Sequence, residues 1–350
     1  MRTVADVISS IPRNTKWNPI PAPVYEDTGN TTRIALAVES MKRHTTDEGW
    51  QIMDGLGRAG YKLCGRHLEV DESDVGRILD KTNPGTVFVQ DKREWGFSPR
   101  DFRDPDSRFT NIEALKPRSD IFKVTILKDA QGDPAFHIQS AMEMNAHAWV
   151  VYYHPRIVKH VAPYVRAKHL IRTTHSVDTA AIPPFDMVPD RRGCLLSGAI
   201  GKCYPLRQRL FAYKKDLFQT TTLKHPGYHV NGCVTPSFLC LLSSFKVSIC
   251  TSSMYGYALR KIIESTACGC RVITDLPVDE VLPEIDDNLI RVKHTIHLRA
   301  INEVIEDAIT SYSPTHQKQL AEAAKKYYSV EAVGQRLASD IESIRSTYSQ

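Results

Sequence analysis

Short apolar runs alternate along most of the chain with segments whose apolar residues recur at helical spacing. In the first half, runs at residues 33–39, 86–91, 122–129 and 148–153 predict buried strands, and a weaker run at 169–175 predicts a fifth. Residues 47–60 carry a helical pattern that ends in Gly60. Strands that alternate with helices predict a parallel sheet with helices on both faces.

The same alternation starts again in the second half. Between the two halves, residues 179–193 contain three prolines and show no periodicity, so we expect a domain boundary there. Beyond it, the pattern predicts strands at 194–201, 246–253, 271–275 and 289–292, and helices at 205–217, 257–268, 297–311 and 315–346. The sequence thus predicts two successive α/β domains, with a ligand site at the carboxyl ends of the strands, in a cleft between the domains.

Composition narrows the class of protein. The 350 residues exceed what one hydrophobic core usually serves, and 42% are hydrophobic and 24% charged, as in ordinary globular proteins. No apolar stretch is long enough to span a bilayer, and the first residues lack the apolar core of a signal peptide, so we expect a cytoplasmic protein without a membrane span. The net charge of +5 permits a polyanionic partner without requiring one.

The eight cysteines are scattered along the chain and most lie in apolar runs, which favours free, buried thiols. Cys268 and Cys270 lack a second pair of ligands at a zinc-like spacing. We therefore expect no metal site.

The segment with the most chemistry spans residues 252–275. A predicted strand ends there in a turn that contains Ser and Gly and opens a helix, and free N–H groups at a helix start favour a phosphate. Arg260 and Lys261, in the first turn of this helix, are placed to neutralise a diphosphate. Glu264 lies four residues after Arg260 on the same helix face. Its carboxylate has two alternatives: to accept hydrogen bonds from a ribose diol, or to pair with Arg260 on the helix surface.

This segment resembles the donor-site signature of GT-B glycosyltransferases. It is most similar to the group typified by bacterial spore-maturation glycosyltransferases, a group that is itself similar to glycosyltransferase family 4. Further pieces fit in the same order: Leu195 to Ile200 followed by Tyr204-Pro205-Leu206-Arg207, then His225-Pro226-Gly227-Tyr228, and Tyr328-Ser329-Val330 before the last helix. The resemblance covers about residues 170–345. One acidic residue that many family 4 members carry would fall near Gly256 and is missing.

The resemblance implies the GT-B fold, with two Rossmann-like domains: an acceptor-binding domain at 1–180, a nucleotide-sugar-binding domain at 190–325 and a helix at 326–350 that packs back toward the first. It implies transfer of a hexose from a nucleoside diphosphate sugar, most often a UDP-sugar, to a hydroxyl without a metal ion or other cofactor. It assigns Glu264 to the ribose and Tyr257 to the wall of the pocket. The residues it assigns to the diphosphate are Arg260, Lys261, Ser197, Gly198 and Arg207.

Two aspartates follow strands of the first half, where a carboxylate faces the ligand crevice. Asp129 is the first candidate for the general base of an inverting transferase and Asp91 the second, because phage DNA glucosyltransferases place their catalytic Asp in a comparable order. Either aspartate can instead cap a helix or a turn. His175, at the end of the first half, is expected to border the cleft and to hydrogen-bond the donor.

The acceptor stays open between three alternatives. Basic and aromatic residues mix at 91–108, and further basic residues lie at 156–172. Such residues either contact the phosphates and bases of a nucleic acid or form a solvated face of the protein. The chain is then a transferase acting on a glycan, protein or small molecule, a transferase acting on hydroxymethylated pyrimidines in DNA, or a non-catalytic module that binds nucleotide sugars.

Overall fold

A computed structural model describes residues 23–43, 47–90, 109–128, 143–152, 169–226 and 233–348. The chain divides into two compact units. Unit 1 comprises residues 1–174 and 331–350, and unit 2 comprises residues 175–330. Asp91 and Asp129 lie outside the described residues, so their predicted roles stay predictions.

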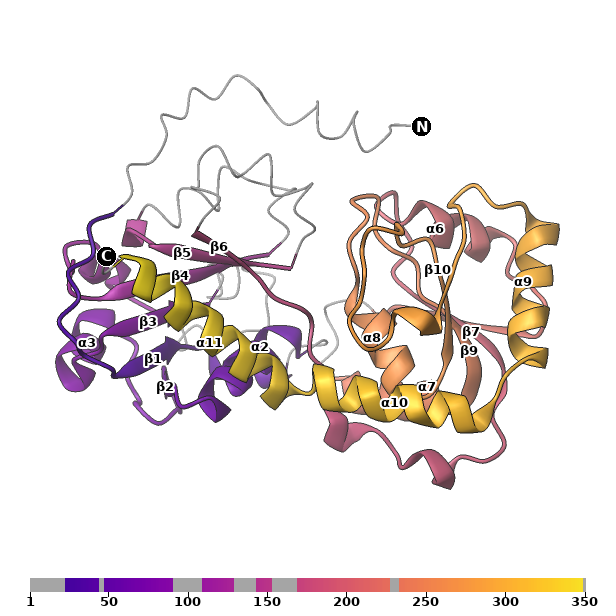
Figure 1. Cartoon of the computed structure of the whole chain (residues 1–350), viewed down its shortest axis with the longest axis horizontal. Helices are drawn as coiled ribbons and strands as arrows, with labels where there is room; N and C mark the ends of the chain where they lie inside the picture. Colours follow the sequence, from indigo (N-terminus) through magenta and orange to yellow (C-terminus); the bar gives the residue numbers. More distant parts are fainter. Residues whose placement is uncertain are drawn as a thin grey trace, which may run out of the picture. The chain divides into compact units, whose positions relative to one another are not determined.

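Unit 1 contains a parallel sheet of six strands in the order β2-β1-β3-β4-β5-β6 (Figure 1). All residues of β3, β4 and β5 are buried, which is why these strands read as continuous apolar runs in the sequence. The strands are β1 (Arg33–Leu36), β2 (Lys62–Cys64), β3 (Thr86–Val89), β4 (Phe122–Leu127), β5 (Ala148–Val151) and β6 (Leu170–Arg172).

Two helices, α2 (Glu48–Arg58) and α11 (Val330–Tyr348), share one core cluster with the sheet of unit 1 (Figure 1). They approach each other closely, because a Cβ added to Gly334 of α11 would lie 2.1 Å from the carbonyl oxygen of Gly55 of α2. A third helix, α3 (Val75–Thr82), begins at Asp74, whose carboxylate accepts a hydrogen bond from the Arg77 N–H.

The end of the chain is anchored in unit 1 by Arg345. Its buried guanidinium donates to the Tyr25 hydroxyl at 2.7 Å, to Thr86 Oγ1 at 3.1 Å and to Asp27 Oδ1 at 3.1 Å. Truncating such a buried, paired cation costs several kcal/mol, about 3–5 by analogy with other buried pairs. Helix α11 is therefore an integral part of unit 1.

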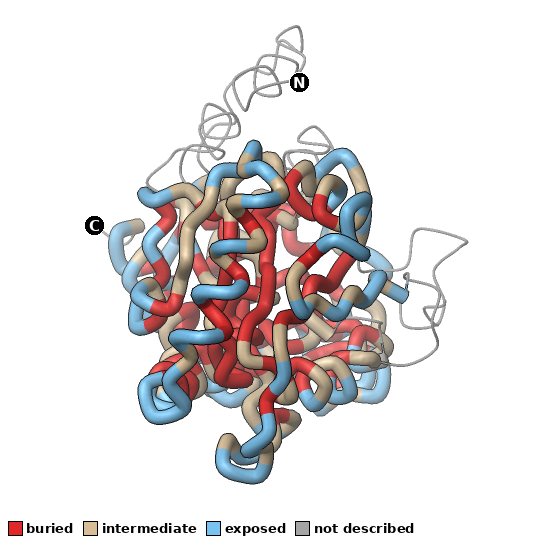
Figure 2. The backbone as a smooth tube through the Cα atoms, turned by 90° about the vertical axis from the view of Figure 1, so that its right-hand side faces the viewer, coloured by how far each residue is buried: buried red, intermediate tan, exposed pale blue. Residues whose placement is uncertain are grey.

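Unit 2 contains a second parallel sheet, of five strands in the order β11-β10-β9-β7-β8. Figure 2, seen from the side of unit 2, draws buried stretches in red in the interior and exposed turns in pale blue around them. The strands are β7 (Arg192–Gly198), β8 (Thr220–Lys224), β9 (Phe245–Ile249), β10 (Arg271–Thr274) and β11 (Leu289–Arg291).

Helices cover both faces of this sheet. One core cluster joins Leu195 of β7 to helices α7 (Thr235–Ser243), α8 (Arg260–Ala267) and α10 (Pro314–Tyr328). The other joins the alternate residues Cys194 and Leu196 to α6 (Pro205–Ala212) and α9 (Leu298–Thr310). The two-residue period of β7 thus supplies both layers, and the predicted α/β class with two parallel sheets is confirmed.

The chain pattern predicted one helix over 315–346, and this was wrong. Residue Ser329 has extended backbone angles and separates α10 from α11. The Val177 N–H donates to the Tyr328 carbonyl at 2.8 Å, which removes that carbonyl from the helical pattern. The Tyr328 hydroxyl also donates to the Pro283 carbonyl at 2.8 Å, so the break is fixed within unit 2.

The proline-rich segment 179–193 packs within unit 2. Arg191 donates to the Cys268 carbonyl at the end of α8 at 2.7 Å, and its guanidinium lies 4.2 Å from the centre of the Phe185 ring. The hydrogen bond to Cys268 ties the segment to the carboxyl end of α8. None of the helices in the described part of the chain combines the length and the apolar character that a membrane crossing requires.

Candidate functional site

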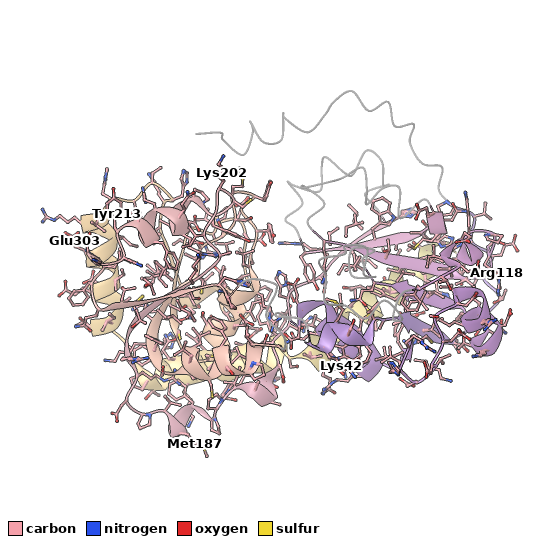
Figure 3. The ribbon with its side chains drawn as sticks, turned by 180° about the vertical axis from the view of Figure 1, so that it is seen from behind. Lys42, Arg118, Met187, Lys202, Tyr213 and Glu303 are labelled. Carbon is pink, nitrogen blue, oxygen red and sulfur yellow. The ribbon has the colours of Figure 1, made fainter. Side chains whose placement is uncertain are left out.

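The parallel strands of unit 2 bring their carboxyl ends to one edge of the sheet, where helices α6 and α8 begin. Figure 3 labels Lys202, on the loop that follows β7, and Met187, on the turn that precedes it, and the two lie at opposite ends of unit 2. The edge near Lys202 is therefore the carboxyl edge. In open α/β sheets this edge is the usual place for a ligand.

Two cationic side chains, which we call the cationic pair, converge at this edge: Arg207 of α6 and Lys261 of α8. Gly198 ends β7 with a φ of +127°, a conformation that L side chains rarely adopt. A Cβ added to Gly198 would lie 2.6 Å from Arg207 Nη1 and 3.1 Å from Lys261 Nζ. Both cations thus face one point over the Gly198 backbone, where only glycine fits.

Neighbouring groups hold the cationic pair in place. Arg207, of which 3% is exposed, donates to the Ala199 carbonyl at 3.2 Å and to the Thr251 carbonyl at 3.3 Å. Lys261 Nζ donates to Ser197 Oγ at 3.3 Å. Aromatic rings flank both cations, with Tyr204 4.2 Å from the Arg207 guanidinium and Phe238 4.9 Å from the Lys261 ammonium.

The electrostatics of the pair favour an anion. Burial, together with the nearby charge of Arg207, lowers the pKa of Lys261 to about 8, although Glu264 opposes the shift. Lys261 is half-buried and forms no ion pair with any residue that the structure describes. A negatively charged ligand over Gly198 would relieve the repulsion between the two cations.

Arg260 and Glu264 form an ion pair within α8, with Arg260 Nε 2.7 Å from Glu264 Oε1. The pair is buried, with 8% of Arg260 and 4% of Glu264 exposed, and Arg260 also donates to Thr235 Oγ1 at 3.4 Å. The ion-pair alternative therefore forms, but inside unit 2 rather than on its surface. The diphosphate role of Arg260 and the ribose role of Glu264 stay predictions.

Two further predicted residues lie in unit 2 and are buried. Tyr257 comes just before α8 and 7% of it is exposed, and His175 begins unit 2 and is also 7% exposed. The contacts that define the cationic pair involve neither residue. Their roles as pocket wall and donor ligand stay predictions.

Sequence reasoning missed Asp275, which follows β10 at the same edge. Asp275 Oδ1 accepts a hydrogen bond from the Ser252 N–H at 2.6 Å, at the start of the turn that leads into α8. Burial raises the pKa of this carboxyl above its usual value, although the hydrogen bonds from Ser252 oppose the shift. The sequence carries a signal for it, because Asp275, like Asp91 and Asp129, stands at the end of a predicted strand.

The cysteines are free in the structure. Cys268 Sγ donates to the Leu239 carbonyl at 3.5 Å and Cys270 Sγ to the Leu242 carbonyl at 3.2 Å. Burial raises the pKa of Cys268 to about 12, so its thiol stays protonated. Both thiols thus join α7 to the short segment between α8 and β10.

Comparisons with known proteins show similarity in three dimensions alone: no protein-family model matches the sequence, and no curated protein does. A glycosyltransferase from Rickettsia africae superposes with a TM-score of 0.54 at 11% identity, over 90% of this chain and 99% of that one. Sucrose-phosphate synthase from Thermosynechococcus elongatus superposes with a TM-score of 0.55 at 12% identity, over 90% and 100%.

A third similar structure is an alpha-glucosyltransferase in complex with UDP-glucose and DNA containing an abasic site. It superposes with a TM-score of 0.53 at 9% identity, over 89% of this chain and 99% of that one. The superpositions establish the fold, but at identities this low the function has to be argued from the site. The chain has the two-domain α/β fold of the GT-B glycosyltransferases.

Proposed function

We propose that this protein is a glycosyltransferase that moves a hexose from a nucleoside diphosphate sugar to an acceptor hydroxyl, and that unit 2 binds the donor. One observation carries the proposal: Arg207 and Lys261 face a single point over the backbone of Gly198, at the carboxyl edge of a parallel sheet. A diphosphate matches that point in charge. The GT-B fold and a similar structure that holds UDP-glucose support a UDP-sugar as the donor.

The cationic pair also accounts for the chemistry. When the bond between the sugar and the diphosphate breaks, negative charge develops on the leaving diphosphate, and preorganised cations stabilise it. Arg207 and Lys261 would do there what a divalent metal ion does in other transferases. We therefore propose a metal-independent reaction, which predicts that transfer continues unchanged in excess EDTA.

The acceptor side of the reaction rests on the sequence. Asp129, or second Asp91, is proposed to take the proton of the acceptor hydroxyl. An Asp129→Asn variant should then bind the donor as the parent protein does and transfer sugar at a strongly reduced rate. Equal transfer rates in the variant and the parent would remove Asp129 from this role.

A thermal-shift screen of UDP-, GDP- and ADP-sugars tests donor binding, because a ligand that binds the folded state raises the Tm. Arg207→Gln and Lys261→Gln should each abolish the shift. Lys202→Gln is the matched control, because Lys202 is an exposed cation on the loop between β7 and α6 and its loss changes the net charge equally. Glu264→Ala should abolish the shift if Glu264 holds the ribose. The proposal fails if no nucleotide sugar shifts the Tm, or if Lys202→Gln loses the shift equally.

A DNA acceptor is the second candidate, favoured by the similar structure that contains DNA as well as UDP-glucose. Phosphate contacts make binding to duplex DNA fall steeply with salt, so affinity across a salt series separates a DNA acceptor from a glycan, protein or small molecule. Release of nucleoside diphosphate from the donor separates any transferase from a module that binds without reacting.

A further inference from the structure

The loop that follows β10 packs against the turn that opens α8. Two carboxylates of this loop accept hydrogen bonds from backbone N–H groups of the turn: Asp275 from Ser252 at 2.6 Å and Glu280 from Ala258 at 3.4 Å. Charge-assisted hydrogen bonds of this kind fix backbone geometry. Loop and turn therefore form one wall beside the carboxyl edge of the sheet.

Asp275 lies next to the cationic pair along this wall. Strand β10 pairs with β9, and β9 pairs with β7, so the ends of these strands follow each other at a spacing of about 5 Å. The carbonyl of Thr251 accepts a hydrogen bond from Arg207, and the next residue, Ser252, donates to Asp275. Through hydrogen bonds, the adjacent residues Thr251 and Ser252 thus connect Arg207, at the proposed diphosphate position, to Asp275.

Of the three carboxylates around this turn, Asp275 is the one that a ligand can reach. Glu264 is 4% exposed and pairs with Arg260, and Glu280 is 1% exposed, whereas Asp275 is half-buried. The Ser252 N–H donates to Oδ1 of Asp275 and the Ser252 hydroxyl adds a second hydrogen bond to the carboxyl group, but an ionised carboxylate has about four acceptor positions and can accept further hydrogen bonds. In a nucleotide sugar, hydroxyl groups of the ribose and of the hexose flank the diphosphate on either side.

We propose that Asp275 accepts a hydrogen bond from a hydroxyl group of the bound donor, on its ribose or on its hexose, and so helps to select the donor. This inference rests on the proposed function. It gives the site a carboxylate in the loop after β10, whereas the acidic residue that the sequence lacks would fall near Gly256, in the turn before α8.

Electrostatics makes the inference sharply testable. Replacing Asp275 by Asn removes a negative charge near the proposed diphosphate position, so Coulomb's law alone predicts tighter binding of an anion. A lost hydrogen bond between the carboxylate and a hydroxyl predicts weaker binding instead. The amide oxygen of Asn still accepts the Ser252 N–H, so the turn keeps its anchor.

The experiment compares the parent protein, Asp275→Asn and Asp279→Asn by calorimetric titration with UDP and with UDP-glucose. Asp279 is exposed on the same loop, so its variant matches the charge change. We expect Asp275→Asn to weaken binding about 10- to 100-fold, as for a hydrogen bond to a charged group. Equal weakening for both ligands assigns the ribose, and weakening confined to UDP-glucose assigns the hexose. The Tm of each ligand-free variant shows whether it is folded.

If Asp275→Asn binds both ligands as tightly as Asp279→Asn does, or more tightly, the inference is overturned while donor binding by the cationic pair stands. If the parent protein binds neither ligand, the titration uses the nucleotide sugar that raises the Tm in the screen and its nucleoside diphosphate, and if no nucleotide sugar binds, the proposed function fails as well. An Asp275→Ser variant guards against a folding defect in the Asn variant, because the hydroxyl can still accept from Ser252. A weakened Asp275→Ser variant with the parent's Tm supports the inference.

Discussion

The proposed role of Lys261 predicts that donor binding depends on pH in a range where few side chains titrate. Its ordinary pKa of 10.5 is lowered to about 8 in the ligand-free protein by burial and by the charge of Arg207. Glu264 raises the pKa, while Arg260, on the same helix, lowers it. The remaining contacts of the ammonium, with Ser197 Oγ and the Phe238 ring, are uncharged.

The sign of the effect follows from linkage. A diphosphate stabilises the charged ammonium, so binding raises the pKa of Lys261 back toward its ordinary value. With a pKa of about 8, about nine-tenths of the ammonium is charged at pH 7 and about one-tenth at pH 9. Binding is thus strongest below the pKa of the free protein and weakens above it. The Kd for UDP should rise about tenfold from pH 7 to pH 9, or about 1.4 kcal/mol.

Calorimetric titration of UDP at several pH values, in buffers with different heats of ionisation, measures both the Kd and the protons taken up. Above about pH 7 the terminal phosphate of UDP is fully ionised, since its pKa is near 6, so the ligand adds no slope of its own. A Lys261→Arg variant keeps its charge throughout and should bind UDP without the slope and without proton uptake.

The reasoning is refuted if the Kd of the parent protein stays constant from pH 7 to pH 9. It is refuted equally if Lys261→Arg shows the parent's slope. Arg207→Gln gives an independent check if the Arg variant of Lys261 does not fold. With the neighbouring charge gone, the pKa of Lys261 in the ligand-free variant should rise, which an NMR titration of the Lys261 ammonium measures without any ligand.

Three further changes have expected outcomes. Gly198→Ala should cost about 1–2 kcal/mol of stability, because the residue has a positive φ. It should also abolish the thermal shift by UDP, because the new Cβ displaces Arg207. Gly201→Ala is the control, since Gly201 lies on the same loop with open space around it, and it should have neither effect. Gly334→Ala should lower the free energy of unfolding, measured by urea titration, by about 1–3 kcal/mol, because its Cβ meets the Gly55 carbonyl, and an unchanged free energy would contradict the packing of α11 on α2. Lys261→Met should raise the Tm of the ligand-free protein while removing the shift by UDP, and a lower Tm would mean that the ammonium stabilises the fold.

The strands that the sequence predicted well are those buried on both faces, such as β4 and β9, because their apolar runs are nearly continuous. The edge strand β8 (Thr220–Lys224) was missed, because most of its residues are partly or fully exposed and no apolar run marks it. The hydrophobic pattern missed the boundary between α10 and α11 for a different reason, although the resemblance placed Tyr328-Ser329-Val330 before the last helix. Tyr328 and Ser329 leave the helix because of contacts with Val177 and Pro283, which are distant in sequence.

The candidate site was predictable in its residues more than in its geometry. Spacing and resemblance predicted that both Arg207 and Lys261 bind the diphosphate, but only the order of the parallel strands places both over Gly198. Arg260 looked equivalent to Lys261, yet the helical repeat turns its guanidinium toward Glu264 and Thr235. The difference between two adjacent residues of α8 depends on which helix face each occupies, which sequence alone assigns weakly.

Helix α8 gives its two adjacent cations different surroundings. Arg260 has a carboxylate at 2.7 Å, so its charge is compensated within the protein. Lys261, one residue later, faces another cation and has its pKa lowered, so at neutral pH its charge opposes folding until an anion arrives. A purely structural lysine gains nothing from this electrostatic destabilisation of the folded protein. A lysine that binds an anion does gain, because the bound diphosphate relieves the repulsion and this relief adds to the binding free energy. The contrast between these neighbours is the strongest physical reason to place the donor over Gly198.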